Sequence, residues 1–101
     1  MLVSQAVVTI DRPARWAKQL ADHFSHKIEV EDVPGGRLVH FEAGDGLIAS
    51  TEWALLMNAR AETEEQVAQV QGVLARHLER FAHNEGVEIV WTESAPVDLP
   101  A

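Results

Sequence analysis

Two segments of this chain repeat apolar residues at helical spacing, and each repeat forms a single stripe along one side of the helix. The first, expected to be a helix from Arg12 to about Ser25 with Asp11 as its N-cap, carries its stripe at Pro13, Ala17, Leu20, Ala21 and Phe24. The second follows Thr63-Glu64-Glu65-Gln66, which has capping-box spacing, and carries its stripe at Val67, Val70, Leu74, Leu78 and Phe81. Because a helix with one stripe must bury it against another layer, both helices are expected on one face of one sheet.

The remaining segments are typical of strands, because they are rich in β-branched residues or alternate apolar with polar ones. They cover residues 6–10, 28–31, 38–42, 47–50, 53–59 and 87–91. Glycine-rich turns at 34–36 and 43–46 separate the middle strands and predict an antiparallel meander. The sequence therefore predicts an α+β, two-layer sandwich of order β-α-β-β-β-β-α-β, with a mostly antiparallel sheet and two helices on one face.

Length and composition narrow the classes of protein that this chain can belong to. Its 101 residues suit one domain, expected over residues 1–92, with a flexible tail over 93–101. A net charge of −8 argues against nucleic-acid binding, and the apolar runs are too short for a membrane span. The absence of cysteine excludes a disulfide framework and thiolate metal ligands. The first residues lack the features of an export signal, so we expect a cytoplasmic protein.

Apolar residues are expected on both faces of the meander, although the helices can cover only one. We assign Val39, Phe41, Ala54 and Leu56 to the face that would meet water. An exposed apolar patch of this kind usually marks a partner surface. We therefore predict either a homodimer or a docking surface there, and the sequence favours neither over the other.

Histidines and basic residues near the ends of both helices form the candidate ligand site. If the helices pack side by side, Trp16, His23, His77 and Arg80 converge in the groove between them. Such a groove would offer an indole face, imidazoles and a guanidinium to a small anionic or aromatic ligand. The simpler interpretation is that these are half-buried boundary side chains, hydrogen-bonded to carbonyls or carboxylates.

The sequence gives little support for a metal, cofactor or catalytic site. His23 and His26 share a helix face, but no further ligands at matching spacing complete a metal site, so none is expected. No serine lies in a nucleophile elbow and no glycine-rich loop leads into a helix, so no catalytic residue or cofactor is assigned. An enzyme with His23 or His77 as general base ranks last among the functions considered.

Two stretches carry a resemblance to a known family. They are residues 11–27, which include Asp11-Arg12-Pro13-Ala14-Arg15-Trp16 and His23-Phe24-Ser25-His26-Lys27, and residues 77–91, which begin His77-Leu78-Glu79-Arg80-Phe81-Ala82 and end at Trp91. Together they resemble a family of small bacterial proteins of unknown function, whose domain also occurs fused to siderophore-interacting flavin reductases. The resemblance spans roughly residues 5–92.

The resemblance implies a bacterial, cytoplasmic α+β domain with iron uptake as its context. The matching residues expected to contact a ligand are His23, His26, Lys27, His77 and Arg80. The chain has no flavin-binding segment, so reductase activity is not carried over to it.

The sequence leaves two main hypotheses for the function of this chain. The first is a binding or accessory domain, rather than an enzyme, that takes part in siderophore or iron handling. It is supported by four of the eight basic residues, which fall between residues 12 and 27 and make that region locally less acidic. The alternative is a structural dimerisation or protein-interaction module with no ligand of its own.

Overall fold

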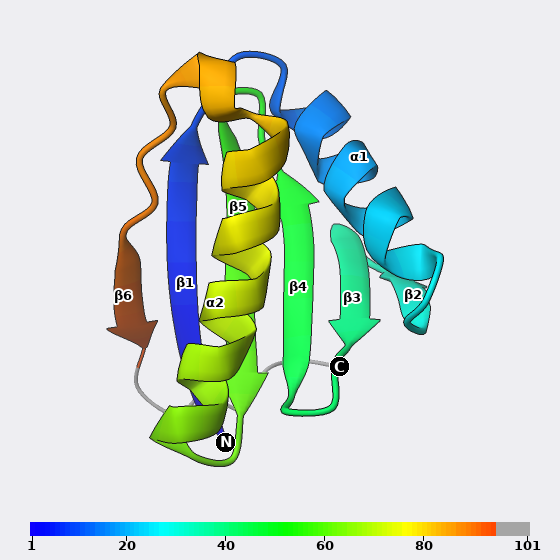
Figure 1. Cartoon of the computed structure of the whole chain (residues 1–101), viewed down its shortest axis with the longest axis vertical. Helices are drawn as coiled ribbons and strands as arrows, with labels where there is room; N and C mark the ends of the chain where they lie inside the picture. Colours follow the sequence, from blue (N-terminus) through cyan, green and yellow to red (C-terminus); the bar gives the residue numbers. More distant parts are fainter. Residues whose placement is uncertain (95–101) are drawn as a thin grey trace.

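The computed structural model describes residues 1–94, which form one antiparallel sheet and two long helices (Figure 1). The elements are β1 (Leu2–Thr9), α1 (Pro13–Ser25), β2 (Val30–Val33), β3 (Gly36–His40), β4 (Asp45–Ser50), β5 (Ala54–Ala61), α2 (Glu64–Phe81), the 3-10 turn η1 (His83–Glu85) and β6 (Trp91–Ser94). The strand order is β2-β3-β4-β5-β1-β6, and every neighbouring pair is antiparallel. The predicted element order is therefore confirmed.

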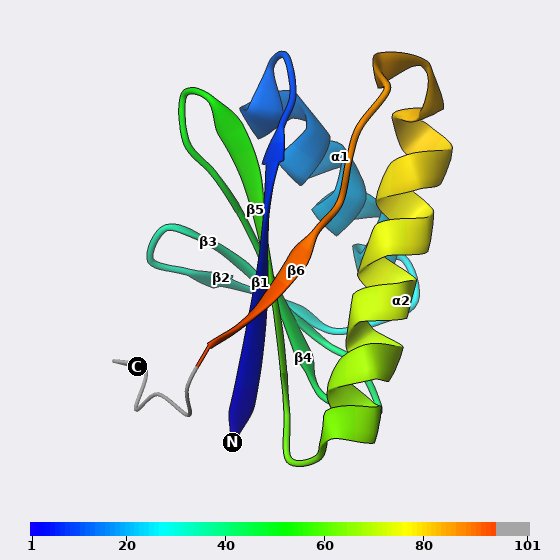
Figure 2. The same cartoon turned by 90° about the vertical axis from the view of Figure 1, so that its left-hand side faces the viewer.

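Both helices lie on the same face of the sheet, as Figure 2 shows with the sheet seen close to its edge. Helix α1 packs over β3, β4 and β5, whereas α2 packs over β1, β4 and β5. The two helices also contact each other. The two-layer sandwich that the single stripes predict is confirmed.

The core fills the space between the helices and this face of the sheet. The largest apolar side chains that are fully buried there are Leu20 of α1, Val70, Leu74 and Leu78 of α2, and Val8, Val39, Ile48, Leu55 and Met57 of the strands. These strand residues alternate with residues on the opposite face, as the period of a strand requires. The core therefore joins both helices to the sheet as one hydrophobic cluster.

The two helix starts differ from each other. Thr63 and Gln66 form the predicted capping box, with Gln66 N donating to Thr63 Oγ1 over 3.1 Å and Thr63 N donating to Gln66 Oε1 over 3.3 Å. The expected Asp11 cap on α1 is wrong, because Arg12 occupies that position in a left-handed conformation with φ 55°. Pro13 disfavours the right-handed helical conformation in the residue before it, so the helix begins at Pro13 itself.

The last strand lies further along the chain than its alternating pattern predicts. Residues 87–90 form no strand, and the ladder with β1 begins where Trp91 pairs with Ala6. Val87 and Ile89 still pack against the core without joining the ladder. Residues 93 and 94 belong to β6 rather than to the expected tail, and residues 95–101 lie outside the described residues.

The assignment of Val39 and Phe41 to the open face of the sheet is wrong. Val39 is fully buried beneath the helices, and the Phe41 ring packs edge-on against Phe24 of α1 with 5.0 Å between ring centroids. The reason is Gly46, which pairs with Val39 and leaves a gap on the helix side. A Cβ at Gly46 would lie 2.9 Å from Phe41 Cε2 and 3.2 Å from Leu74 Cδ1, so these two side chains fill that space.

The capping box yields a stability prediction. We expect Thr63→Ala to lower the free energy of unfolding by about 1 kcal/mol, because the side-chain acceptor of the hydrogen bond from Gln66 N at the start of α2 is lost. Urea unfolding followed by circular dichroism measures this change, with Glu62→Ala, at the exposed neighbouring position, as the control. Equal stability of the two variants would contradict the assignment.

Candidate functional site

The end of α1 meets the last turns of α2 in a cluster of aromatic and imidazole rings. The ring centroids of His23 and His77 lie 4.9 Å apart, and His23 lies 5.1 Å from Phe81. Phe24 lies 5.6 Å from His23 and 4.9 Å from His77. The structure therefore brings together the two histidines that the helical spacing placed on facing helix borders.

Phe24 fixes the position of this cluster. Its side chain is only 4% exposed and packs against the ring of Phe41 beneath the helix. The chain then turns tightly after α1, with Lys27 N and Ile28 N both donating to the carbonyl of Phe24. Because His23 precedes this anchored residue, its ring is directed along the border with α2.

A hollow of about 410 Å³ opens beside the two imidazoles, and we call it the histidine hollow. It is lined by His23, Phe24, His26, Lys27, Ile28, Val73 and His77. A second and shallower hollow of about 460 Å³, the α1 hollow, is lined by Arg15, Lys18, Gln19, Asp22, His23, His26 and Phe81. His23 and His26 border both, so the two hollows adjoin each other.

Two of the expected site residues line neither hollow. Trp16 is half-buried against the core, and its Nε1 donates to the carbonyl of Asp11 over 3.0 Å, so it closes the turn before α1. Arg80 is an exposed residue of the last turn of α2, and its charge acts on His23. The residues that meet at the histidine hollow are therefore His23, His26, Lys27 and His77.

The hydrogen bonds of His77 determine where its proton lies. Its Nδ1 is 2.7 Å from the carbonyl oxygen of Val73, one turn earlier in α2. A carbonyl oxygen can only accept, so Nδ1 carries a hydrogen. In the neutral ring, Nε2 is therefore the nitrogen with a free lone pair.

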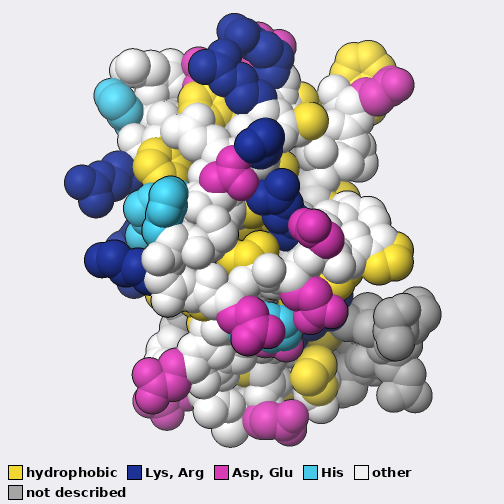
Figure 3. Space-filling view, turned by 90° about the vertical axis from the view of Figure 1, so that its right-hand side faces the viewer, with side chains coloured by type: hydrophobic (Ala, Val, Ile, Leu, Met, Phe, Trp, Pro, Cys, Tyr) yellow, Lys and Arg dark blue, Asp and Glu magenta, His cyan; other side chains and the backbone are white. Residues whose placement is uncertain are grey.

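The surroundings of His23 disfavour its protonated form. Partial burial lowers the pKa of His23 below its ordinary value of 6.5, and the positive charges of His77, His26, Arg80 and Lys27 lower it further. These cations gather on an otherwise acidic molecule. Figure 3, which views the molecule from the side of α1, shows Lys and Arg side chains gathered over the upper part of this face, whereas acidic side chains are spread over both parts.

The acidic group that borders the α1 hollow is already paired. Asp22 accepts hydrogen bonds from Lys18 Nζ and Arg37 Nη1, each over 2.6 Å. These two bonds, that from Lys18 first, lower the pKa of Asp22 below 3.8. The carboxylate is therefore engaged in ion pairs that hold α1 to β3, and the residues that line the histidine hollow include no carboxylate.

A second group of interacting side chains surrounds His40 on the opposite face of the sheet. The sequence patterns did not predict it. His40 Nδ1 lies 3.0 Å from Asp45 Oδ1, and His40 Nε2 lies 3.0 Å from Glu31 Oε1. The hydrogen bond to Glu31 and then that to Asp45 raise the pKa of His40 above 6.5, against the effect of burial. The signal that could have found this cluster is strand register, since β3 pairs His40 with Asp45 of β4.

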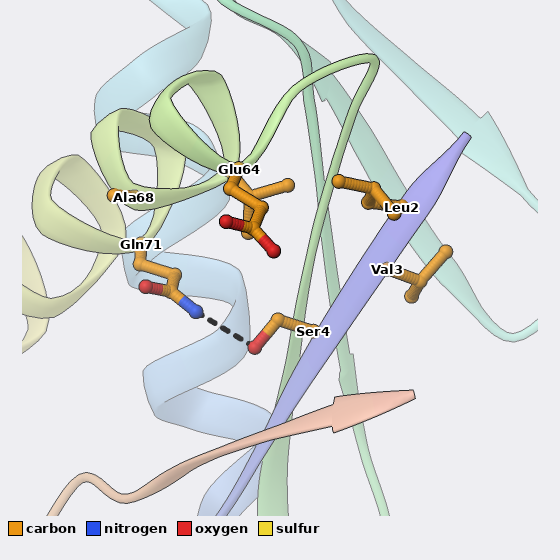
Figure 4. Close-up of a pocket in the computed structure, with 7 residues that line it drawn as sticks. Leu2, Val3, Ser4, Glu64, Ala68 and Gln71 are labelled. Atoms are coloured by element: carbon orange, nitrogen blue, oxygen red, sulfur yellow. Dashed lines mark hydrogen bonds between the residues drawn. The ribbon is translucent and has the colours of Figure 1, made fainter. Parts of the chain in front are cut away.

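A smaller hollow of about 180 Å³ lies between β1 and the first turns of α2 (Figure 4). Its polar partners satisfy one another: Gln71 Nε2 donates to Ser4 Oγ over 2.7 Å, and Ser4 Oγ donates to the carbonyl of Thr92 over 3.2 Å. Ser4 is buried, so this pair ties α2 to β1 and β6. This hollow shares no lining residue with the histidine hollow.

Two further observations concern residues 1–94. Within this range, no three His, Asp or Glu side chains lie together in a way that could hold a metal ion. Neither long helix of the same range combines the length and apolar character needed to cross a membrane.

The His40 cluster yields a pH prediction. Because folding raises the pKa of His40, its contribution to stability is complete below the unfolded pKa near 6.5 and is lost as the pH rises through the higher folded value. We expect the stability difference between the wild type and His40→Gln to shrink from about pH 6 to about pH 8. Urea unfolding across this range measures it, with His83→Gln as the control variant. A constant difference would contradict the assignment.

Comparison with known proteins identifies the family to which this chain belongs. Residues 5–92 match the family described as "Uncharacterized protein conserved in bacteria (DUF2218)". The solved structure "NMR structure of PA4090 from Pseudomonas aeruginosa" is 32% identical, with a TM-score of 0.75, and the match covers 91% of this chain and 96% of that one. No protein with curated annotation matches. The chain therefore belongs to the DUF2218 family of uncharacterized proteins conserved in bacteria.

Proposed function

We propose that this chain is a ligand-binding or accessory domain that takes a small anionic ligand with an aromatic or apolar body in the histidine hollow. The observation that carries the proposal is the meeting of His23 and His77, 4.9 Å apart, beside Lys27 and His26 at one hollow. The volume of about 410 Å³ falls within the range typical of small-molecule sites.

The lining of the hollow defines the chemistry of the ligand. Phe24, Ile28 and Val73 supply apolar surface, which suits a ring or an alkyl chain. Lys27 supplies positive charge and hydrogen-bond donors beside that surface, and the imidazoles add polar nitrogens, which suits a carboxylate or phenolate. An acidic protein with a local cluster of cations selects anions at that cluster and repels them elsewhere.

Iron handling is the biological context that we propose for this ligand. It rests on the resemblance to domains fused to siderophore-interacting reductases, since many ferric siderophore complexes are anionic and carry aromatic arms. The histidine hollow has room for one such arm. The adjoining α1 hollow, with Arg15 and Lys18 on its border, would face the rest of the complex.

The proposal predicts binding of simple probes. We expect benzoate to shift the amide resonances of residues 23–28 and 73–77 in an NMR titration, and a ferric catecholate complex, whose iron is paramagnetic, to broaden them. Benzylamine, with the same ring and opposite charge, should leave them unchanged. Lys27→Gln should weaken binding of benzoate about three- to tenfold, because it removes a charged hydrogen-bond donor at the hollow.

Arg76→Gln is the matched control for this experiment. It removes the same charge from an exposed position of α2 that borders neither hollow. Equal losses in Lys27→Gln and Arg76→Gln would indicate a general charge effect and contradict a site at the hollow. The absence of any shift or broadening with benzoate, the ferric complex and inorganic phosphate would overturn the proposal.

A second candidate function, a homodimer through the open face of the sheet, is supported by the exposure of that face. Neither helix covers it, and Val7 of β1, the strand between β5 and the edge strand β6, is 55% exposed there. Half-buried Leu56 pairs with Val7, and half-buried Leu38 pairs with Leu47 on the same face. Of the four residues assigned to such an interface, Leu56 is half-buried on this face and Ala54 is 7% exposed.

The dimer has its own test. We expect the wild type to sediment as a dimer at about 100 µM and Val7→Glu and Leu56→Glu as monomers, because a buried unpaired carboxylate opposes association. Gln19→Glu, exposed on α1, is the control and should remain dimeric. A wild type that sediments as a monomer at this concentration would exclude the dimer.

A further inference from the structure

We propose that the histidine hollow takes up a proton together with its anionic ligand, so that ligand affinity rises as the pH falls. The inference deepens the proposed function and rests on it, because it concerns how the same site is regulated. It is argued from the contact between the two imidazoles, the position of the His77 proton and the charges around the hollow.

The first step concerns His77. Since its Nδ1 donates to Val73 O over 2.7 Å, Nδ1 stays protonated in both charge states. The nitrogen that is free to contact a ligand is therefore Nε2. Protonation converts a side chain that offers a lone pair into one that offers a second donor to an anion.

The second step concerns the contact between the rings. With centroids 4.9 Å apart, His23 and His77 would repel each other if both were charged. In the free protein this repulsion opposes a second positive charge on the pair. An anion between or beside the rings removes the repulsion, because each imidazolium then interacts with the opposite charge.

The third step concerns the groups that surround the pair. On α1 and just after it these are His26 and Lys27, and on α2 the nearest is Arg80, all of which lower the pKa of His23. Asp22, the carboxylate on the border of the α1 hollow, is engaged by two cations. From the sheet, Phe41 packs beneath and carries no charge.

The fourth step is the linkage between ligand and proton. An anion that raises the histidine pKa must, by reciprocity, bind the protonated site more tightly. Affinity then increases as the pH falls from above the pKa of the liganded site to below that of the free site. Uptake of one full proton corresponds to tenfold in affinity per pH unit, and partial uptake to proportionally less.

The test measures benzoate affinity between about pH 5.5 and about pH 8, a range in which its carboxylate stays ionised. We expect affinity at the acid end to exceed that at the alkaline end at least about threefold. Calorimetry in buffers of different ionisation enthalpy should report net proton uptake on binding. Both effects should diminish in His23→Gln and His77→Gln.

His83→Gln is the matched control, because the Nδ1 of His83 also lies near a carbonyl, that of Arg80, yet the ring borders neither hollow. It should keep the pH dependence and the proton uptake of the wild type. Benzoate binding that is independent of pH, without proton uptake, would overturn this inference and leave the proposed function standing. Failure of benzoate to bind at any pH, with no shift or broadening from a ferric catecholate complex or phosphate either, would overturn both.

Discussion

The burial of one apolar stripe from each helix against a single sheet face is the constraint on which the rest of the structure depends. It places α1 and α2 side by side over one sheet, and the largely buried ring of Phe24 fixes the last turn of α1 against Phe41. Removing a phenylalanine from such a position typically costs about 3–5 kcal/mol. Because His23 and the turn at Lys27 flank this ring, the geometry of the histidine hollow follows from core packing.

The charges of the molecule are divided between two histidine environments with opposite properties. His23 lies among cations, where its charged form is disfavoured, whereas His40 lies between two carboxylates, where its charged form is favoured. The carboxylates of Glu31 and Asp45 are occupied by His40, so that cluster joins β2, β3 and β4. The histidine hollow has no such internal counter-charge, and this is why we assign the ligand to it.

The sequence predicted the sandwich and the meeting of the helices because helical periodicity depends only on neighbours along the chain. It misplaced Phe41 because the gap above Gly46 arises from strand pairing, where the glycine faces both Phe41 and Leu74. It misplaced the last strand for a similar reason: alternation over residues 87–90 does not show that the ladder with β1 begins at Trp91. His23 and His77 could be paired from helix geometry, whereas the contacts of His40 require the strand register.

The most direct measurement of the central claim is a proton–proton NOE experiment on the free protein with assigned imidazole resonances. With ring centroids 4.9 Å apart, the account predicts cross-peaks between the ring protons of His23 and His77, and between His77 and Phe24. Ring protons of His23 that show contacts only within α1, with none to α2, would contradict the account.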